Sequence, residues 1–428
     1  MTLLIGQEAT SGLGVSHGTS AKAAFDRWFR YPAGLSQHAL SRLFAEGRNP
    51  SGGAIVDPFC GAATVGTRAA SVSRAFVGVE AHPEIANLAR LKLAPAPAAG
   101  ELAHAAAAVA AAAAMVSTER DVSSEIALVG RCFDPKVLSV LVNLRDAIKA
   151  TDNDTTDYLK WALLATLRDV ANVKVGWPYL RPNLARTPPH SDAAQRFVSR
   201  VGWMAKDLAT RTSDPVATIV DGDSGSAVTW AQAQLLEGPK GSVALTSPPY
   251  LNNFDYADAT RLEMYFWGRN TSWSEMVADV RADMLVATTQ QSSKFGAEFA
   301  LEGLTHLPRT RQTVIELSAR LTHERETHSG GKEYDRVLPE YMLGITRVLE
   351  QLTRNLVPGS WCGWVVGDSA PYGIYVDTPG LIQAAATEQG YSDPESEVLR
   401  ARGLRWRTNG TRHQVALDER IVWMRTPI

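Results

Sequence analysis

Cysteine is scarce in this chain of 428 residues, which contains three: Cys60, Cys132 and Cys362. They lie far apart, without a Cys-x-x-Cys pair, and the histidines show no spacing typical of ligands, so the sequence predicts neither a disulfide framework nor a metal site. A long apolar run is also missing, because the longest such stretch consists mainly of alanine. We therefore expect no membrane-spanning segment and no membrane partner.

A strong excess of positive charge is absent too, since the formal net charge is −2 at pH 7. This balance argues against a dedicated, strongly basic nucleic-acid-binding domain, although local basic patches are enough to contact phosphates. Residues 1–20 lack a basic segment followed by an apolar core, so we expect no secretory signal and a cytoplasmic location. With 45% apolar and 21% charged residues, the composition is that of a globular protein.

The clearest regular pattern is a strand, a turn of small residues and a helix, followed by a second strand. Residues 53–57 form an apolar strand pattern, 58–63 are mostly small, and 64–73 have a helical pattern. A second strand is predicted at 75–80 and a helix at 83–93. This order opens a βαβ unit and predicts parallel strands.

Later segments complete an α/β pattern. Further strands are predicted at 216–220, 242–246, 361–366, 398–407 and 420–425, the last two as an antiparallel pair. From 94 to 214, alanine-rich and amphipathic stretches predict an all-helical insertion instead. The simplest account is an α/β domain with a mostly parallel sheet, an antiparallel terminal strand and this helical insertion.

The turn after the first predicted strand, Asp57-Pro-Phe-Cys-Gly-Ala-Ala-Thr64, carries the first chemical signal. Small residues at the carboxyl end of a strand let a ligand lie against backbone amides and the amino end of the next helix. Glu80 ends the second strand, where a carboxylate can hydrogen-bond to the ribose hydroxyls of an adenosine-type cofactor. By themselves these residues are equally typical of a tight turn with a surface acid.

A second signal follows the fourth predicted strand directly, in Thr246-Ser-Pro-Pro-Tyr250. Two consecutive prolines cannot continue a strand ladder or form a helix interior, so they hold an extended turn with exposed carbonyl groups. The Ser247 hydroxyl on one side and the Tyr250 ring on the other would form a small polar slot with a stacking wall. Taken alone, the motif would be a proline turn that ends a strand.

Together, and in this order, the two motifs resemble those of the DNA amino-methyltransferases, the enzymes that make N4-methylcytosine or N6-methyladenine. The first resembles their cofactor signature, Asp-Pro-Phe-x-Gly-x-Gly-Thr, and Ser247-Pro-Pro-Tyr250 resembles their catalytic signature, (Asp/Asn/Ser)-Pro-Pro-(Tyr/Phe). The segment with Tyr31 and Pro32 resembles the one that precedes their cofactor turn, and Asp223 stands where they place an acid near the adenine. The resemblance covers residues 20–93, 215–268 and 333–428.

The resemblance implies a class I, Rossmann-like methyltransferase fold with S-adenosylmethionine as the cofactor. It assigns cofactor binding to Tyr31, Pro32, Asp57, Pro58, Phe59, Cys60, Gly61, Thr64, Glu80 and Asp223, and catalysis to Ser247, Pro248, Pro249 and Tyr250. Ser247 and the Pro248 carbonyl group would accept the two N–H bonds of the target amine, while Tyr250 stacks on a flipped base. No nucleophilic cysteine is required.

Serine at the head of the catalytic motif favours cytosine N4 over adenine N6 as the target. Double-stranded DNA is the expected substrate, in restriction–modification or another anti-phage system with partner subunits. One alternative is a methyltransferase acting on the N2 amine of guanine in RNA, a family that shares the Asp-Pro-Phe-Cys-Gly turn but usually has Asp-Pro-Pro-Tyr and an added RNA-binding domain. The other is a catalytically weakened core that serves as a DNA-binding subunit of a defence complex. Ala63, which replaces the second glycine of the cofactor signature, is the best support for this second alternative.

Two segments fall outside the resemblance. The catalytic core is assigned to 1–93, 215–268 and 333–428, which leaves 94–214 and 269–332 as insertions. DNA contact is assigned to 269–332, because it follows the catalytic motif directly, and its phosphate-binding candidates are Arg309, Arg311, Arg320 and Arg325. The arginines between 400 and 412 are the next candidates, and the helices of 94–214 are predicted to be scaffold or partner contacts.

Overall fold

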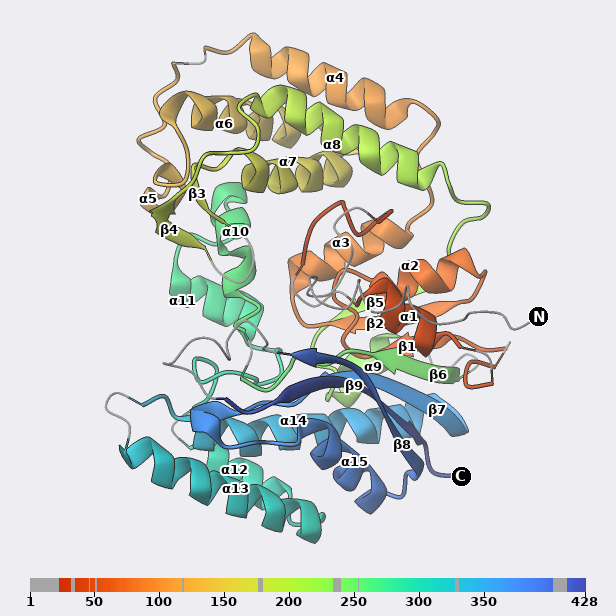
Figure 1. The fold of residues 1–428 in the computed structure, drawn as a ribbon. Coiled ribbons are helices and arrows are strands. Elements are labelled where there is room, and N and C mark those ends of the chain that lie inside the picture. The colour runs from red at the N-terminus through yellow and green to blue at the C-terminus, as the bar shows by residue number, and fades with distance from the viewer. Residues whose placement is uncertain are drawn as a thin grey trace, which may run out of the picture.

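The computed structural model describes residues 23–31, 35–45, 47–50, 52–117, 119–175, 180–233, 240–252, 254–293, 295–327, 331–402 and 414–428. Within these ranges, the strands of the main sheet are β1 (Ile55–Asp57), β2 (Phe76–Glu80), β5 (Ala217–Asp221), β6 (Gly241–Thr246), β7 (Leu356–Gly367), β8 (Ser392–Arg402) and β9 (Leu417–Arg425). They lie side by side in the order β5-β2-β1-β6-β7-β9-β8, through the middle of the molecule (Figure 1).

The sheet is mostly parallel. β1 pairs in parallel with β2 and β6, β2 with β5, and β6 with β7, whereas β9 is antiparallel to both β7 and β8. This arrangement confirms the predicted α/β class, the mostly parallel sheet and the antiparallel strand, and it is compatible with a Rossmann-like fold. The strand order reverses between β1 and β6, and ligands of such sheets bind outside the carboxyl ends of the strands at this switch point.

Helices cover both faces of the sheet, which explains why its central strands are apolar throughout. On one face, Ile55 and its neighbours pack with α1 (Gln37–Leu43), α2 (Thr64–Ser71) and α3 (Pro83–Leu93). On the other face, Val56 and its neighbours pack with α9 (Ala227–Gln232), α14 (Tyr334–Asn355) and α15 (Thr378–Glu388). Successive residues of β1 therefore face opposite layers, as the pleat of a strand requires.

The insertion after α3 contains α4 (Glu101–Ala114), α5 (Ala127–Gly130), α6 (Pro135–Lys149), α7 (Thr156–Val170) and α8 (Ala193–Leu208). The prediction that this insertion is all-helical is wrong in one stretch. Between α7 and α8, β3 (Val173–Lys174) and β4 (Arg181–Ala185) form an antiparallel pair. Pro182, Pro188 and Pro189 occur in this stretch, and because proline lacks an N–H donor it prevents a continuous helix there.

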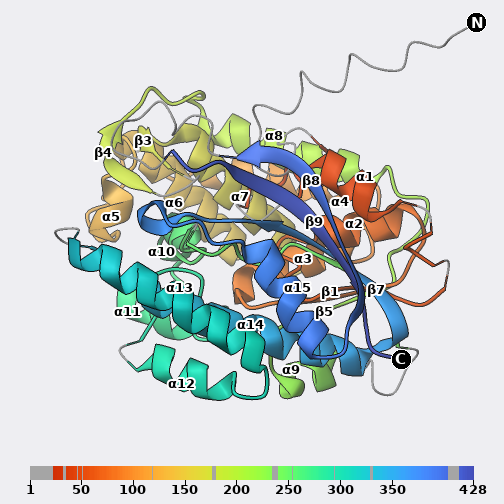
Figure 2. The same cartoon turned by 60° about the horizontal axis from the view of Figure 1, so that its bottom comes forward.

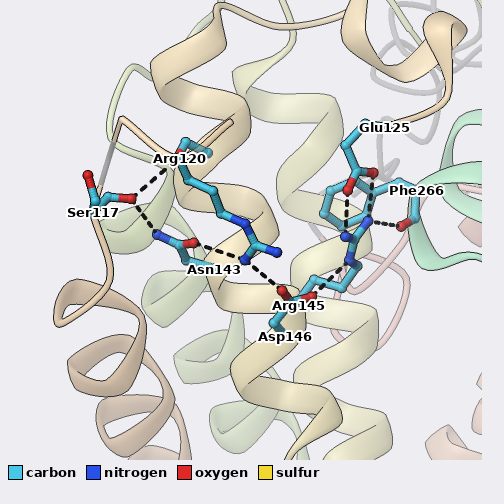
Figure 3. Close-up of polar contacts among 8 residues, drawn as sticks. Ser117, Arg120, Glu125, Asn143, Arg145, Asp146 and Phe266 are labelled. Atoms are coloured by element: carbon cyan, nitrogen blue, oxygen red, sulfur yellow. Dashed lines mark hydrogen bonds and ion pairs between the residues drawn. The ribbon is translucent and has the colours of Figure 1, made fainter. Parts of the chain in front are cut away.

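The insertion shares a core with the sheet domain. Its buried side chains form one hydrophobic cluster with Ile85 of α3 and with Phe266 of α10 (Arg261–Trp267), the helix that follows the predicted catalytic motif. Figure 3 shows Arg145 of α6 between these parts: its guanidinium donates to the Glu125 carboxylate at 2.6 and 2.8 Å and to the Phe266 carbonyl at 2.8 Å. The apolar faces of the insertion are therefore covered from within the chain.

The segment after α10 contains two groups of helices. A first group comprises α11 (Trp273–Met276) and a π-helical turn (Val277–Arg281), and a second comprises α12 (Gly296–Gly303) and α13 (Pro308–Thr327). Helices α12 to α15 lie on the side of the sheet opposite the insertion in Figure 1, and Figure 2 brings α13 and α14 forward, packed side by side. Two 3-10 turns, Asp258–Thr260 and Pro371–Gly373, complete the elements. None of the described helices has the length and apolar composition needed to cross a bilayer.

Candidate functional site

The two predicted motifs meet at the switch point of the sheet. β1 ends at Asp57 and β6 ends at Thr246, on neighbouring strands. The Thr246 hydroxyl donates a hydrogen bond to Oδ1 of Asp57, which also accepts the Phe59 N–H at 3.0 Å. Burial raises the pKa of Asp57 to about 7, against the lowering effect of these two hydrogen bonds. Asp57 therefore holds the turn after β1 in a fixed position relative to the turn after β6.

Glu80, at the end of β2, fastens the same turn from the other side. Its carboxylate accepts the N–H of Gly61 at 2.9 Å and the N–H of His82 at 2.8 Å. Gly61 has a φ of 52°, a left-handed conformation in which a side chain is unfavourable. Burial raises the pKa of Glu80 to about 7, although both hydrogen bonds favour the ionised form. The turn is thus held by two buried carboxyl groups.

Two adjoining cavities lie at this edge of the sheet. The charged cavity, of about 390 Å³, is lined by Asp26, Phe29, Tyr31, Leu35, Asp57, Phe59, Cys60, Ala62, Thr64, Val65, Lys92 and Ser247. The aromatic cavity, of about 510 Å³, is lined by Tyr31, Pro58, Phe59, Glu80, Ala81, Ser224, Ser247, Pro249, Tyr256, Asp283, Met284, Leu285 and Gln291. They share Tyr31, Phe59 and Ser247, so one elongated ligand can extend through both.

Most of the predicted site residues come together here. Tyr31, Asp57, Pro58, Phe59, Cys60, Thr64, Glu80, Ser247 and Pro249 each line at least one cavity. Pro32 lies outside the described residues. Asp223 does not face the described cavities, because its carboxylate accepts the Gly225 N–H at 2.8 Å, and the next residue, Ser224, lines the aromatic cavity instead. Gly61 contributes through its backbone bond to Glu80, and Pro248 is buried beside Ser247.

Tyr250 is part of a polar cluster at the β8–β9 hairpin. Its hydroxyl donates to the Glu419 carboxylate at 2.9 Å, and Glu419 in turn pairs with Arg400 at 2.7 Å. The Arg402 guanidinium lies 4.9 Å from the Tyr250 ring centroid. Burial, followed by the nearby Glu419 charge, raises the pKa of Tyr250 well above its usual value. Two arginines that were candidates for phosphate binding are therefore engaged around the catalytic motif, while Arg405, Arg407 and Arg412 lie outside the described residues.

Arg309 and Arg311 lie at the opposite edge of the sheet. The Arg309 N–H donates at 2.9 Å to Glu388, the last residue of α15, and the Arg311 guanidinium donates at 2.8 Å to the Leu301 carbonyl. Glu388 comes just before β8, whose first residue lies level with the start of β7. The start of a parallel strand is at its amino edge, whereas the cavities are at the carboxyl edge. The structure therefore does not bring these arginines to the predicted site.

Two charged residues of the site were not singled out from the sequence. Asp26 lies near the segment of Tyr31, and Lys92 lies on α3. Lys92 continues the helical spacing of Ile85 and Ala89, both fully buried, so a lysine on an otherwise apolar helix face was the available signal. The 283–291 wall of the aromatic cavity gave no such signal, because it is an irregular polar stretch.

Comparison of the chain with protein-family models, with curated proteins and with solved structures finds no match. The chemistry must therefore be argued from the site. Its cavities combine buried carboxyl groups, a hydroxyl beside a rigid proline turn, and aromatic walls. Such a set can bind a polar ligand with a flat ring system and can accept hydrogen bonds from an amine at Ser247.

Proposed function

We propose that this protein is an S-adenosylmethionine-dependent methyltransferase that modifies an exocyclic amino group of a base in DNA, with cytosine N4 favoured over adenine N6. One observation carries the proposal: Ser247, the first residue of the Ser-Pro-Pro-Tyr turn, lines both cavities. A ligand held by the turn after β1 and a substrate amine held by the turn after β6 would therefore meet at Ser247. The class I methyltransferase fold belongs to the same proposal.

The donor and acceptor groups present fit this cofactor. Glu80 lines the aromatic cavity and retains lone pairs for ribose hydroxyl groups beyond its two backbone bonds. Tyr256, Met284 and Leu285 give the same cavity apolar walls suited to a purine, and Ser224 adds a hydroxyl group at the end of β5. When bound, the cofactor supplies an electrophilic methyl group.

The chain's own residues would prepare the nucleophile. An exocyclic amine is a weak nucleophile because its lone pair is delocalised into the ring of the base. If the Ser247 hydroxyl and the Pro248 carbonyl accept its two N–H bonds, the nitrogen moves towards tetrahedral geometry and its lone pair is freed. Arg402 covers one face of the Tyr250 ring, so a flipped base would stack on the other face.

Ala63 gives little support to a catalytically weakened core. Its backbone has the left-handed conformation, with a φ of 58°, that glycine would adopt at this position. The residue is fully buried in the core, and it is Ala62 that lines the charged cavity. The extra methyl group therefore points into the protein interior, and its cost is backbone strain of about 1–2 kcal/mol.

Mass spectrometry of nucleosides from host DNA and RNA, with and without the gene, tests the proposal. We expect N4-methylcytosine in DNA only when the gene is present. N6-methyladenine alone would correct the base and keep the reaction class. Methylated RNA with unmodified DNA would favour the RNA guanine-N2 alternative, and no difference in either nucleic acid would contradict the proposal. A role in restriction–modification or phage defence, with partner subunits in the cytoplasm, is proposed on the same basis.

A further inference from the structure

The charged cavity contains one acid and one base that are both withdrawn from solvent. The side chain of Asp26 belongs to a residue that is 5% exposed, and Lys92 is 1% exposed. They come from different parts of the chain, the turn before Tyr31 and the end of α3, yet both line the same cavity. Burying a charge is costly unless it is paired and hydrogen-bonded, so each of these groups needs a partner.

Neither group is adequately satisfied by the described part of the chain. Lys92 Nζ donates to the Ala62 carbonyl at 2.9 Å, and this is the one acceptor found for its three donors. Asp26 Oδ1 is 3.4 Å from the Thr64 hydroxyl, a weak contact. Among the described residues no ion pair joins Asp26 to Lys92. Burial accordingly raises the pKa of Asp26 to about 6 and lowers the pKa of Lys92 to about 8.

Asp207, a neighbouring buried acid, shows what a structural carboxylate looks like in this region. It accepts the Phe25 N–H at 2.9 Å, the Trp28 indole N–H at 2.9 Å and the guanidinium of Arg27. All its capacity is used within the protein, and it does not line either described cavity. Asp26 and Lys92 differ from Asp207 because their unused capacity faces a cavity.

We infer that the charged cavity binds the zwitterionic α-amino acid group of a nucleoside ligand, with the ligand ammonium against Asp26 and the ligand carboxylate against Lys92. The inference rests on the proposed function for the nucleoside part, which would occupy the aromatic cavity. The shared residues Tyr31, Phe59 and Ser247 connect the two parts. A zwitterion supplies one opposite charge to each buried group, whereas a neutral ligand would leave both uncompensated.

Calorimetric titration of the full chain with three probes tests this inference. S-adenosylhomocysteine carries the nucleoside and the amino acid, 5′-methylthioadenosine carries the nucleoside alone, and methionine carries the amino acid alone. The wild type should bind S-adenosylhomocysteine at least about 100-fold more tightly than 5′-methylthioadenosine, since two charge-assisted interactions are lost in the shorter probe.

Substitutions assign the effect to the two residues. Lys92→Met and Asp26→Asn should each weaken S-adenosylhomocysteine binding by about 10- to 100-fold and leave 5′-methylthioadenosine binding unchanged. Unchanged binding of the shorter probe also shows that each variant is folded. Lys160→Met is the matched control, because Lys160 is a buried lysine of α7 that pairs with Glu84 outside the described cavities. It should leave both affinities unaltered.

The outcomes separate this inference from the proposed function. Equal wild-type affinity for S-adenosylhomocysteine and 5′-methylthioadenosine would overturn the amino-acid site and leave the nucleoside site standing. A strong preference that survives both Lys92→Met and Asp26→Asn would overturn the assignment to these residues. Binding of methionine that depends on Lys92, without binding of either nucleoside, would support the amino-acid site and overturn the proposed function.

Discussion

The amino and carboxyl edges of the same sheet are built differently. At the amino edge, the guanidinium of Arg74 donates to the Gly53 carbonyl and the Ser242 hydroxyl, and also to acceptors in residues 49–52, so its donors are well used. At the carboxyl edge, Lys92 is more deeply buried yet has one described acceptor. Polar groups at the first edge hold the fold together, whereas those at the second are left for a ligand.

The largest expected difference between the edges lies at the two ends of β6. Ser247→Ala should lower the rate of DNA methylation by about 10²- to 10³-fold, because it removes an acceptor for the amine protons, while S-adenosylhomocysteine binding is kept. Ser242→Ala, at the start of the same strand, should retain the wild-type rate. Radiolabelled methyl transfer to duplex DNA measures both, and equal rates for Ser247→Ala and wild type would exclude Ser247 from catalysis.

Two left-handed glycines offer a second comparison. Gly61→Val should weaken S-adenosylhomocysteine binding by about 10- to 100-fold, because a β-branched residue is strained at this φ and the turn would lose its bond to Glu80. Gly47, with a φ of 88° in the connection before β1, has open space around it. Gly47→Val should therefore lower the melting temperature without weakening binding in calorimetry. Similar binding losses in both variants would show that strain anywhere in the chain is enough.

The pH dependence of stability should also differ between the edges. Burial raises the folded-state pKa of Glu80 to about 7, above the unfolded value. The stabilising contribution of the protonated group is complete below the unfolded pKa and is lost as the pH rises through 7. Between pH 5 and pH 8, the free energy of unfolding of Glu80→Gln should therefore rise relative to wild type by on the order of 2–3 kcal/mol. Urea unfolding at both pH values measures this difference, and Asp26 and Asp57 cancel because both proteins contain them.

Glu388, at the amino edge, provides the control for this pH effect. Burial acts to raise its pKa, but hydrogen bonds from Thr310 and Arg309 outweigh burial and keep the pKa below its usual value. Its contribution to stability is therefore complete above the unfolded pKa. The difference between Glu388→Gln and wild type should stay constant from pH 5 to pH 8, and a drift equal to that of Glu80→Gln would contradict the assignment.

The smallest expected effects concern DNA. Arg30 is exposed beside Tyr31 at the cavity edge, so Arg30→Ala should weaken DNA binding several-fold and reduce its salt slope by about one unit. Arg309→Ala combined with Arg311→Ala should leave affinity and slope unaltered, because Arg309 lies at the amino edge. Fluorescence anisotropy over a range of salt concentrations distinguishes these outcomes. A reduced slope in the double variant alone would place DNA on the amino edge instead.

Local patterns in the sequence predicted the sheet and much of the site. Each central strand is a short apolar run that ends in a recognisable turn, so Asp57, Glu80 and Ser247 could be placed at the ends of strands from neighbouring residues alone. The turn after β4 and the order of the strands needed no long-range information for the same reason. What the sequence could not supply were contacts between distant segments.

Asp26, Lys92 and Arg309 show the limit. Whether Lys92 is a snorkelling surface lysine or part of a cavity depends on where residues 26–31 lie, and nothing near Lys92 in the chain encodes that position. The edge on which Arg309 lies depends on the packing of α13 against α15. Direct succession after the catalytic motif suggested proximity, but helices α12 and α13 carry the chain across the sheet before α14 returns it.

The pairing of β2 with β5 has a consequence for how the chain assembles. Glu80 lies opposite Asp221 in this pair, although the whole of 94–214 separates the two strands in sequence. The helices α4, α6, α7 and α8 contact one another extensively, so they can collapse early, while β2 still has an open edge. A compact helical unit then delivers β5 to that edge, which makes the insertion an assembly step and its deletion a route to aggregation through unpaired β2.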